Sequence, residues 1–154
     1  MKINAKKNTM KDFSPLVLPI DVVGSMDPQN DEHYIVAVNS YYNGIQKDLF
    51  SITVGNDYSV YAIMTLQNQI YYLISDDDGY AQFYPAELFE IKNNYLSFDW
   101  CFHMYSILEA SGYKEARLFL FAPDFIQSYR DLISLIQSDP VIVRKFLDYK
   151  AGML

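Results

Sequence analysis

The chain has 154 residues, of which 51% are hydrophobic and 16% aromatic, and it carries a formal net charge of −7 at pH 7. This length and apolar content suit one domain with its own core, and they exclude a mainly disordered chain. Cys101 is the single cysteine, which excludes an intramolecular disulfide and is typical of a reducing compartment.

The first third of the sequence is predicted to contain a leader and a helix. We interpret residues 1–15 as a flexible leader and residues 16–154 as a single globular domain. Asp27 and Pro28 suit the N-cap and first position of a helix, and apolar residues follow at helical spacing up to the Asn-Gly pair at 43–44. The leader lacks the apolar region that a secretory signal peptide needs. No stretch of the sequence approaches the roughly 20 apolar residues of a membrane span. We therefore expect a cytoplasmic protein that does not bind membranes.

The middle of the sequence is predicted to form an antiparallel meander. Short apolar or alternating runs are separated by turn-forming residues, among which Asp76-Asp77-Asp78-Gly79 is a strong turn signal. The predicted strands are Leu49–Val54, Tyr58–Leu66, Ile70–Ser75, Tyr80–Tyr84 and Glu87–Ile91. Several of these residues make both faces of the sheet apolar, so each face must be covered or serve as an interface. The C-terminal helices can cover one face and the N-terminal helix the other.

The C-terminal part of the sequence contains one ambiguous segment and two predicted helices. Residues 98–108 fit either a helical stripe or a strand. Pro123-Asp124 suits the start of a helix whose apolar spacing continues to Ile136. Ser138-Asp139-Pro140 then ends that helix and begins another, with Gly152 beyond its end. The expected fold is α+β, with an N-terminal helix, C-terminal helices and a curled antiparallel sheet of about five strands that could form an SH3-like barrel.

The sequence offers few residues for catalysis or metal binding. Cys101 and His103 would share one face of a strand, but a thiol nucleophile also needs a depressed pKa and an oxyanion site. The other histidine, His33, is distant in sequence, and the glycines are too dispersed for a phosphate loop. The run of three aspartates lacks the spacing of a calcium loop. We expect no enzyme activity, cofactor or metal, although a pair of carboxylates meeting across a cleft stays open.

Negative charge is concentrated in the middle of the chain. Residues 21–100 contain twelve acids and two lysines, whereas residues 1–20 contain four lysines and one aspartate and the remainder is balanced. An acidic surface repels nucleic acid and attracts a basic protein; the alternative is that the charge serves solubility alone. We expect a protein partner and no nucleic acid. Carboxylates steer encounter and aromatics slow dissociation, so the candidate contacts are Asp57, Asp76, Asp77, Asp78 and Tyr80.

Part of the chain resembles a group of small bacterial proteins with a strand-rich core. The stretches that carry the resemblance are Tyr58–Ile63, Tyr72–Asp77, Phe83–Ile91 and Trp100. Here the chain resembles immunity proteins, which neutralise toxins delivered between competing bacteria, including contact-dependent inhibition toxins. The resemblance implies tight protein binding in the cytoplasm, and it transfers no active-site residue.

Two functions stay open at the level of sequence. The first is an immunity-type protein that binds a cognate toxin, for example a nuclease, and occludes its basic active site. The alternative is a non-catalytic interaction module, housekeeping or phage-encoded, that could form homo-oligomers. The sequence leaves the oligomeric state and the activity of the toxin open.

Overall fold

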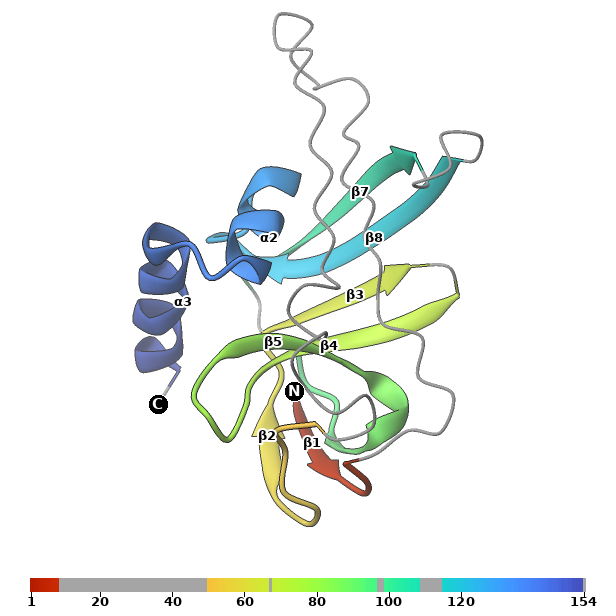
Figure 1. Ribbon diagram of the computed structural model, residues 1–154, viewed down its shortest axis with the longest axis vertical. Coiled ribbons are helices and arrows are strands. Elements are labelled where there is room, and N and C mark those ends of the chain that lie inside the picture. Colours follow the sequence, from red (N-terminus) through yellow and green to blue (C-terminus); the bar gives the residue numbers. More distant parts are fainter. Residues whose placement is uncertain (9–49, 67, 97–98, 109–114, 154) are drawn as a thin grey trace, which may run out of the picture.

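The computed structural model describes residues 1–8, 50–66, 68–96, 99–108 and 115–153. These residues form two antiparallel sheets and two α-helices (Figure 1), which confirms the predicted α+β class. The helix predicted over residues 27–44 lies outside the described residues. Within the described part of the chain, neither helix combines the length and the apolar character needed to cross a bilayer.

The smaller sheet has three strands in the order β2-β1-β6. They are β1 (Lys2–Ala5), β2 (Asp57–Ser59) and β6 (Phe89–Asn93). The larger sheet has the order β5-β4-β3-β8-β7. It consists of β3 (Ala62–Leu66), β4 (Gln69–Ser75), β5 (Ala81–Pro85), β7 (Trp100–Leu108) and β8 (Glu115–Pro123). The 3-10 turn η1 (Ala86–Leu88) precedes β6.

The first residues of the chain are part of the fold. β1 is the central strand of the smaller sheet, and its side chains Ile3 and Ala5 are fully buried. The prediction of a flexible leader over residues 1–15 is therefore wrong for β1. Ile3 and Ala5 alternate with Lys2 and Asn4, which is the two-residue period of a half-buried strand. Residues 9–15 lie outside the described residues.

The larger sheet has five strands, which is the predicted number, but two of its strands differ from those that the sequence predicts. Residues 98–108 resolve as a strand, β7, and β8 has no counterpart among the predicted elements. The predicted strand over 87–91 begins instead with η1 and joins the smaller sheet. β5 and β7 are the sheet edges, and none of the described strand pairings joins them as closure into an SH3-like barrel would require.

Two predicted strands in the first half of the meander are also corrected. The Tyr58–Leu66 run is interrupted because the chain changes sheets: the Val60 amide donates to Met1 O at 3.0 Å, and the Tyr61 amide to Leu73 O at 2.8 Å. Residues 50–54 of the predicted Leu49–Val54 strand are irregular. Phe50 and Ile52 are nevertheless buried, so apolar burial produced a strand-like pattern without strand pairing.

The helices are α2 (Tyr129–Ile136) and α3 (Pro140–Gly152). The prediction that a helix begins at Pro123 is wrong, because Pro123 ends β8 and Ser128 caps α2. Ser128 Oγ accepts from the Asp131 amide at 3.1 Å, and the Asp131 carboxylate accepts from the Ser128 amide at 3.0 Å. The predicted start of α3 is confirmed, since Asp139 accepts from the Val141 amide at 2.9 Å, but Gly152 is its last residue rather than the residue beyond it.

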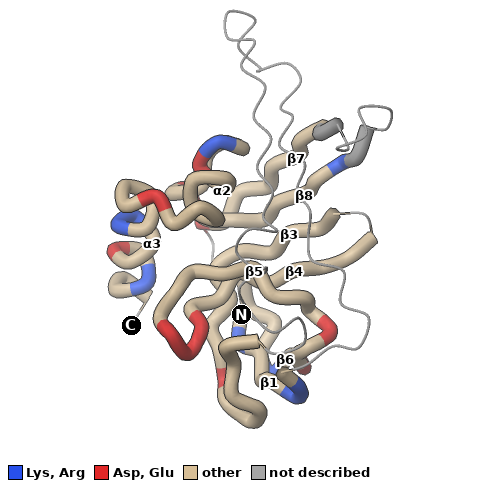
Figure 2. The backbone as a smooth tube through the Cα atoms, viewed as in Figure 1, with Lys and Arg blue, Asp and Glu red and all other residues tan. Residues whose placement is uncertain are grey.

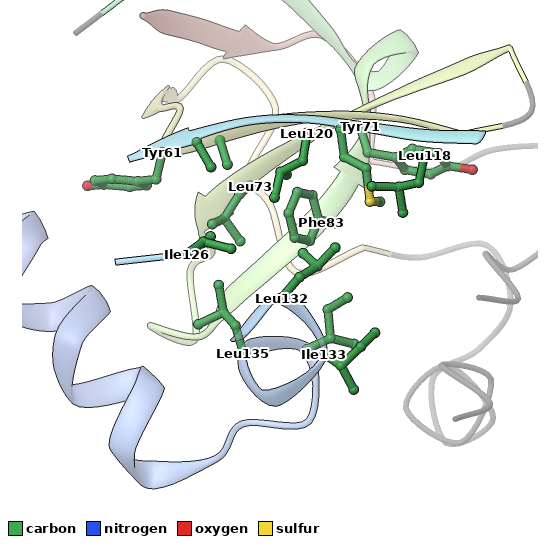
Figure 3. Packing of buried hydrophobic residues seen from close by; sticks show 14 of the residues in the cluster. Tyr61, Tyr71, Leu73, Phe83, Leu118, Leu120, Ile126, Leu132, Ile133 and Leu135 are labelled. Atoms are coloured by element: carbon green, nitrogen blue, oxygen red, sulfur yellow. The ribbon is translucent and has the colours of Figure 1, made fainter. Parts of the chain in front are cut away.

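Both faces of the larger sheet are apolar, as expected. On one face, Leu132 and Leu135 of α2 point toward Leu73, Phe83 and other sheet residues (Figure 3). This confirms that C-terminal helices cover one face. On the other face, strand residues such as Tyr72 and Ile74 form a second core with residues of the smaller sheet. The expected contribution of an N-terminal helix to this cover lies outside the described residues.

Candidate functional site

The acidic run forms the turn of the β4–β5 hairpin. The Asp76 amide donates to Tyr80 O at 2.9 Å, and the Gly79 amide donates to Asp76 O at 3.0 Å. Gly79 has φ of 85°, the left-handed conformation that glycine adopts without a steric penalty. This arrangement is typical of a three-residue hairpin loop with a glycine at its last position. We call residues 76–80 the acidic turn.

Asp76 organises the acidic turn from within. Its side chain is only 8% exposed. Oδ1 accepts from the amides of Asp78 at 3.1 Å and Tyr80 at 2.8 Å, and Oδ2 accepts from the Tyr84 hydroxyl at 2.9 Å. Burial raises the pKa of the Asp76 carboxyl, and the hydrogen bonds from Tyr80 and Tyr84 oppose that rise. The carboxylate is thus committed to holding the turn rather than to meeting a partner.

Asp77 attaches the acidic turn to the segment before β2. Its carboxylate accepts from the Tyr58 hydroxyl at 2.6 Å and from Thr53 Oγ1 at 2.7 Å. Its amide donates to Ser51 O at 3.0 Å. The Tyr58 hydroxyl also accepts from the Thr53 amide at 2.8 Å. These bonds hold Asp77 in one place while its side chain stays exposed.

Asp78 and Tyr80 are the parts of the acidic turn that are free to contact another molecule. Both are exposed, and Tyr80 retains 54% of its accessible surface. Within the described part of the chain, no hydrogen bond or ion pair involves either side chain. The structure therefore presents one carboxylate and one aromatic ring beside the anchored Asp77.

Asp57, the remaining predicted contact, lies apart from the acidic turn. It is on β2, where its carboxylate accepts from Asn4 Nδ2 at 2.7 Å. Successive strand residues point to opposite faces, and it is the neighbouring Tyr58 whose hydroxyl reaches Asp77. The structure thus brings four of the five predicted residues together and places Asp57 on another face.

Among the described residues, no lysine forms an ion pair with the acidic turn, whereas two other acids of this region have lysine partners. Glu87 pairs with Lys7 at 3.0 Å, and Glu90 pairs with Lys92 at 2.5 Å. Of the described residues, Lys150 of α3 comes close, but its ammonium donates to Ser75 Oγ at 2.9 Å. Figure 2 shows the turn as a continuous acidic stretch at the end of the hairpin. We infer that uncompensated negative charge is concentrated there.

Cys101 and His103 each contact a different residue in the structure. Cys101 donates to Asp124 Oδ1 at 3.3 Å, and this hydrogen bond is the main reason that the pKa of its thiol is raised. A nucleophilic cysteine requires the opposite shift. The His103 ring stacks on Tyr105, with ring centres 6.0 Å apart and planes 6° apart. Among the described residues, no three His, Cys, Asp or Glu side chains are grouped to hold a metal ion.

The sequence predicts the acidic turn but not the residues that fix it. Thr53 and Tyr58 are 24 and 19 positions before Asp77, and nothing in a local pattern predicts such pairs. The sequence predicts a strand at Tyr84, but it does not predict the hydrogen bond from the Tyr84 hydroxyl to Asp76. Comparison of the chain with protein-family models, curated proteins and solved structures finds no match in any of the three.

Proposed function

We propose that this protein is an immunity-type protein that binds and inhibits a cognate basic toxin, and that it acts in the cytoplasm. The observation that carries the proposal is the acidic turn, which holds exposed carboxylates and an exposed tyrosine in a fixed arrangement. No lysine of the described residues forms an ion pair with those carboxylates. The resemblance of residues 58–100 to immunity proteins supplies the class of partner. A nuclease is a suitable toxin, because its active site must attract a polyanion and is therefore basic.

The hydrogen bonds of Asp76 and Asp77 support binding by lowering its entropic cost. A loop that already has its bound conformation loses little freedom when a partner arrives. The exposed charges of Asp77 and Asp78 raise the association rate with a basic surface, particularly at low salt. Tyr80 is the aromatic anchor, since a buried tyrosine ring combines apolar contact with a polar hydroxyl and slows dissociation.

The alternative is a non-catalytic interaction module, housekeeping or phage-encoded, that could form homo-oligomers. The uncharged edge strand β7 is the observation in its favour. The two functions predict different effects of the partner on cell growth. A cognate toxin harms cells that lack this protein, whereas the partner of a housekeeping or phage-encoded module does not.

The proposal is tested by capture followed by a neutralisation assay. The tagged protein is used to purify partners from a lysate of its source cells, and the captured proteins are identified by mass spectrometry. The gene of each partner is then induced alone and together with this chain. We expect one basic partner that arrests growth alone and is harmless when this chain is co-expressed. A partner whose expression leaves growth unchanged would contradict the immunity function.

A paired variant shows whether the acidic turn is responsible. Asp78→Asn combined with Tyr80→Ala changes only exposed side chains without described partners, so the fold is expected to persist. We expect this variant to capture less of the partner and to fail to restore growth. The control is Glu90→Gln, which removes an exposed acid on the smaller sheet. Equal loss in both variants would argue against the turn as the binding site.

A further inference from the structure

Among the described strands, β7 is an edge strand whose sequence lacks the usual protection against pairing. It lies at one end of the larger sheet and pairs with β8 in an uninterrupted register from Trp100–Pro123 to Leu108–Glu115. An edge strand directs N–H and C=O groups away from its sheet, and natural proteins protect such edges with charges, prolines or bulges. β7 contains no Asp, Glu, Lys, Arg or Pro over its nine residues. The opposite edge, β5, has five residues and ends in Pro85.

An exposed apolar band ends at this edge. Trp100 is buried, and its ring lies 6.0 Å from that of Phe121. Phe102 stacks on Phe119 at 5.9 Å, yet Phe102 is 60% exposed and Met104 is 54% exposed. The face that is buried at Trp100 therefore continues along β7 as exposed apolar surface at Phe102 and Met104.

We propose that β7 joins two copies of this chain, which pair antiparallel, edge to edge, about a two-fold axis beside Met104. An antiparallel edge is complementary to a copy of itself, because each outward N–H meets an outward C=O of the other strand. Full overlap of the nine-residue strand places Met104 opposite its copy and Phe102 opposite Ser106 of the second copy. The two five-stranded sheets then continue into one sheet, and the apolar band continues across the joint.

The charge distribution favours a second copy as the occupant. Each chain has a net charge of −7, so two copies repel each other least when the surfaces that meet contain no acids, and β7 contains no Asp or Glu. The acidic turn connects β4 and β5, at the far edge of the sheet from β7. Pairing through β7 therefore holds the two acidic turns at opposite ends of the joined sheet and leaves both free for other partners. A basic partner would meet no acid within β7 itself.

The joint is expected to be weak. One strand pair and a few apolar side chains bury less than the roughly 800 Å² per partner of a standard stable interface. We therefore expect a dissociation constant of roughly 1–100 µM, so that the dimer forms as the protein concentration rises through this range.

Sedimentation equilibrium of the full chain over this concentration range tests the proposal. The mass of the wild type is expected to rise from 17.9 kDa towards twice that value. Met104→Lys places two like charges opposite each other across the two-fold axis, so this variant is expected to stay monomeric. Val141→Lys is the control, because Val141 is a similarly exposed apolar residue on α3, and it should dimerise like the wild type.

A mixing experiment tests the register of the two strands. Met104→Glu alone is also expected to be monomeric, whereas an equal mixture of Met104→Lys and Met104→Glu should dimerise, because opposite charges then meet at the axis. If Met104→Lys lowers the melting temperature strongly, Ser106→Lys replaces it, since Ser106 is exposed on the same strand. A wild type that stays at monomer mass throughout, or a dimer that persists in both lysine variants of β7, would overturn the proposal.

Discussion

Among single residues, Asp76 shows how an acid in a charged run can be structural. It accepts three hydrogen bonds from within the hairpin and is nearly covered by it. Asp77 and Asp78, its neighbours, keep their carboxylates exposed. All three residues are aspartates, so the sequence predicts the turn but does not show which aspartate stabilises it. That depends on the Tyr84 hydroxyl, which the β4–β5 register brings to Asp76.

The hydrogen bonds of Asp76 predict different effects for two substitutions. Asp76→Ala leaves two amides and the Tyr84 hydroxyl without their acceptor, so it should lower the free energy of unfolding by about 2–4 kcal/mol. Asp76→Asn keeps the shape and an acceptor oxygen, and its cost should stay below about 1 kcal/mol. Chemical denaturation at pH 7 measures both values. Equal costs for the two variants would show that these hydrogen bonds do not stabilise the fold.

The raised pKa of Asp76 also predicts a pH dependence. The folded protein holds the proton of this carboxyl more tightly than the unfolded chain does, whose pKa is near the ordinary value of 3.8. The stability contributed by this group is therefore full below pH 3.8 and declines as the pH rises through the raised pKa of the folded state. Asp76→Asn does not titrate, so the wild type should lose stability relative to it over this window. Denaturation curves at a series of pH values measure the difference in unfolding free energy between the two proteins. A difference that stays constant, or that grows in favour of the wild type, would show that the pKa of Asp76 is not raised in the folded protein.

Among the elements, α2 shows that a sequence can contain two candidate helix starts, of which the one with the stronger capping interactions is used. Pro123-Asp124 has the composition of a helix start, but the reciprocal bonds of Ser128 and Asp131 satisfy two free amides of the first turn. β8 was missed because Leu118–Phe121 is apolar at every position, and a continuous apolar run does not distinguish a strand from a buried helix. Its Leu118 and Leu120 are fully buried, while Phe119 faces the other side of the sheet.

The cap of α2 is tested by Ser128→Ala. This change removes the acceptor of the Asp131 amide and should cost about 1 kcal/mol of unfolding free energy. Ser134→Ala is the matched control: it makes the same change inside α2, where alanine is the better helix former, and should be neutral or slightly stabilising. Thermal or chemical denaturation compares the two, and equal stability of both variants would show that the box contributes nothing.

In the whole molecule, charge is arranged by contacts between distant segments. Lys7 pairs with Glu87 of η1, 80 positions away, so this lysine is part of the folded structure. Composition predicts a strongly acidic middle segment. The sequence cannot show which of these acids keep an exposed, uncompensated charge, because that depends on strand order and on long-range pairs.

The central claim is that the acidic turn guides a basic partner to the protein, and the association rate of the captured partner tests it most directly. The rate is measured against salt concentration for the wild type, for Asp77→Asn with Asp78→Asn, and for Glu87→Gln with Glu90→Gln. Both double variants remove two negative charges, but only the first removes them from the turn. We expect the turn variant to associate about 3- to 10-fold more slowly at low salt and with a flatter salt dependence, while the control stays within about 2-fold of the wild type. A turn variant that associates at the wild-type rate at low salt, or a control that is slowed equally, would contradict the claim.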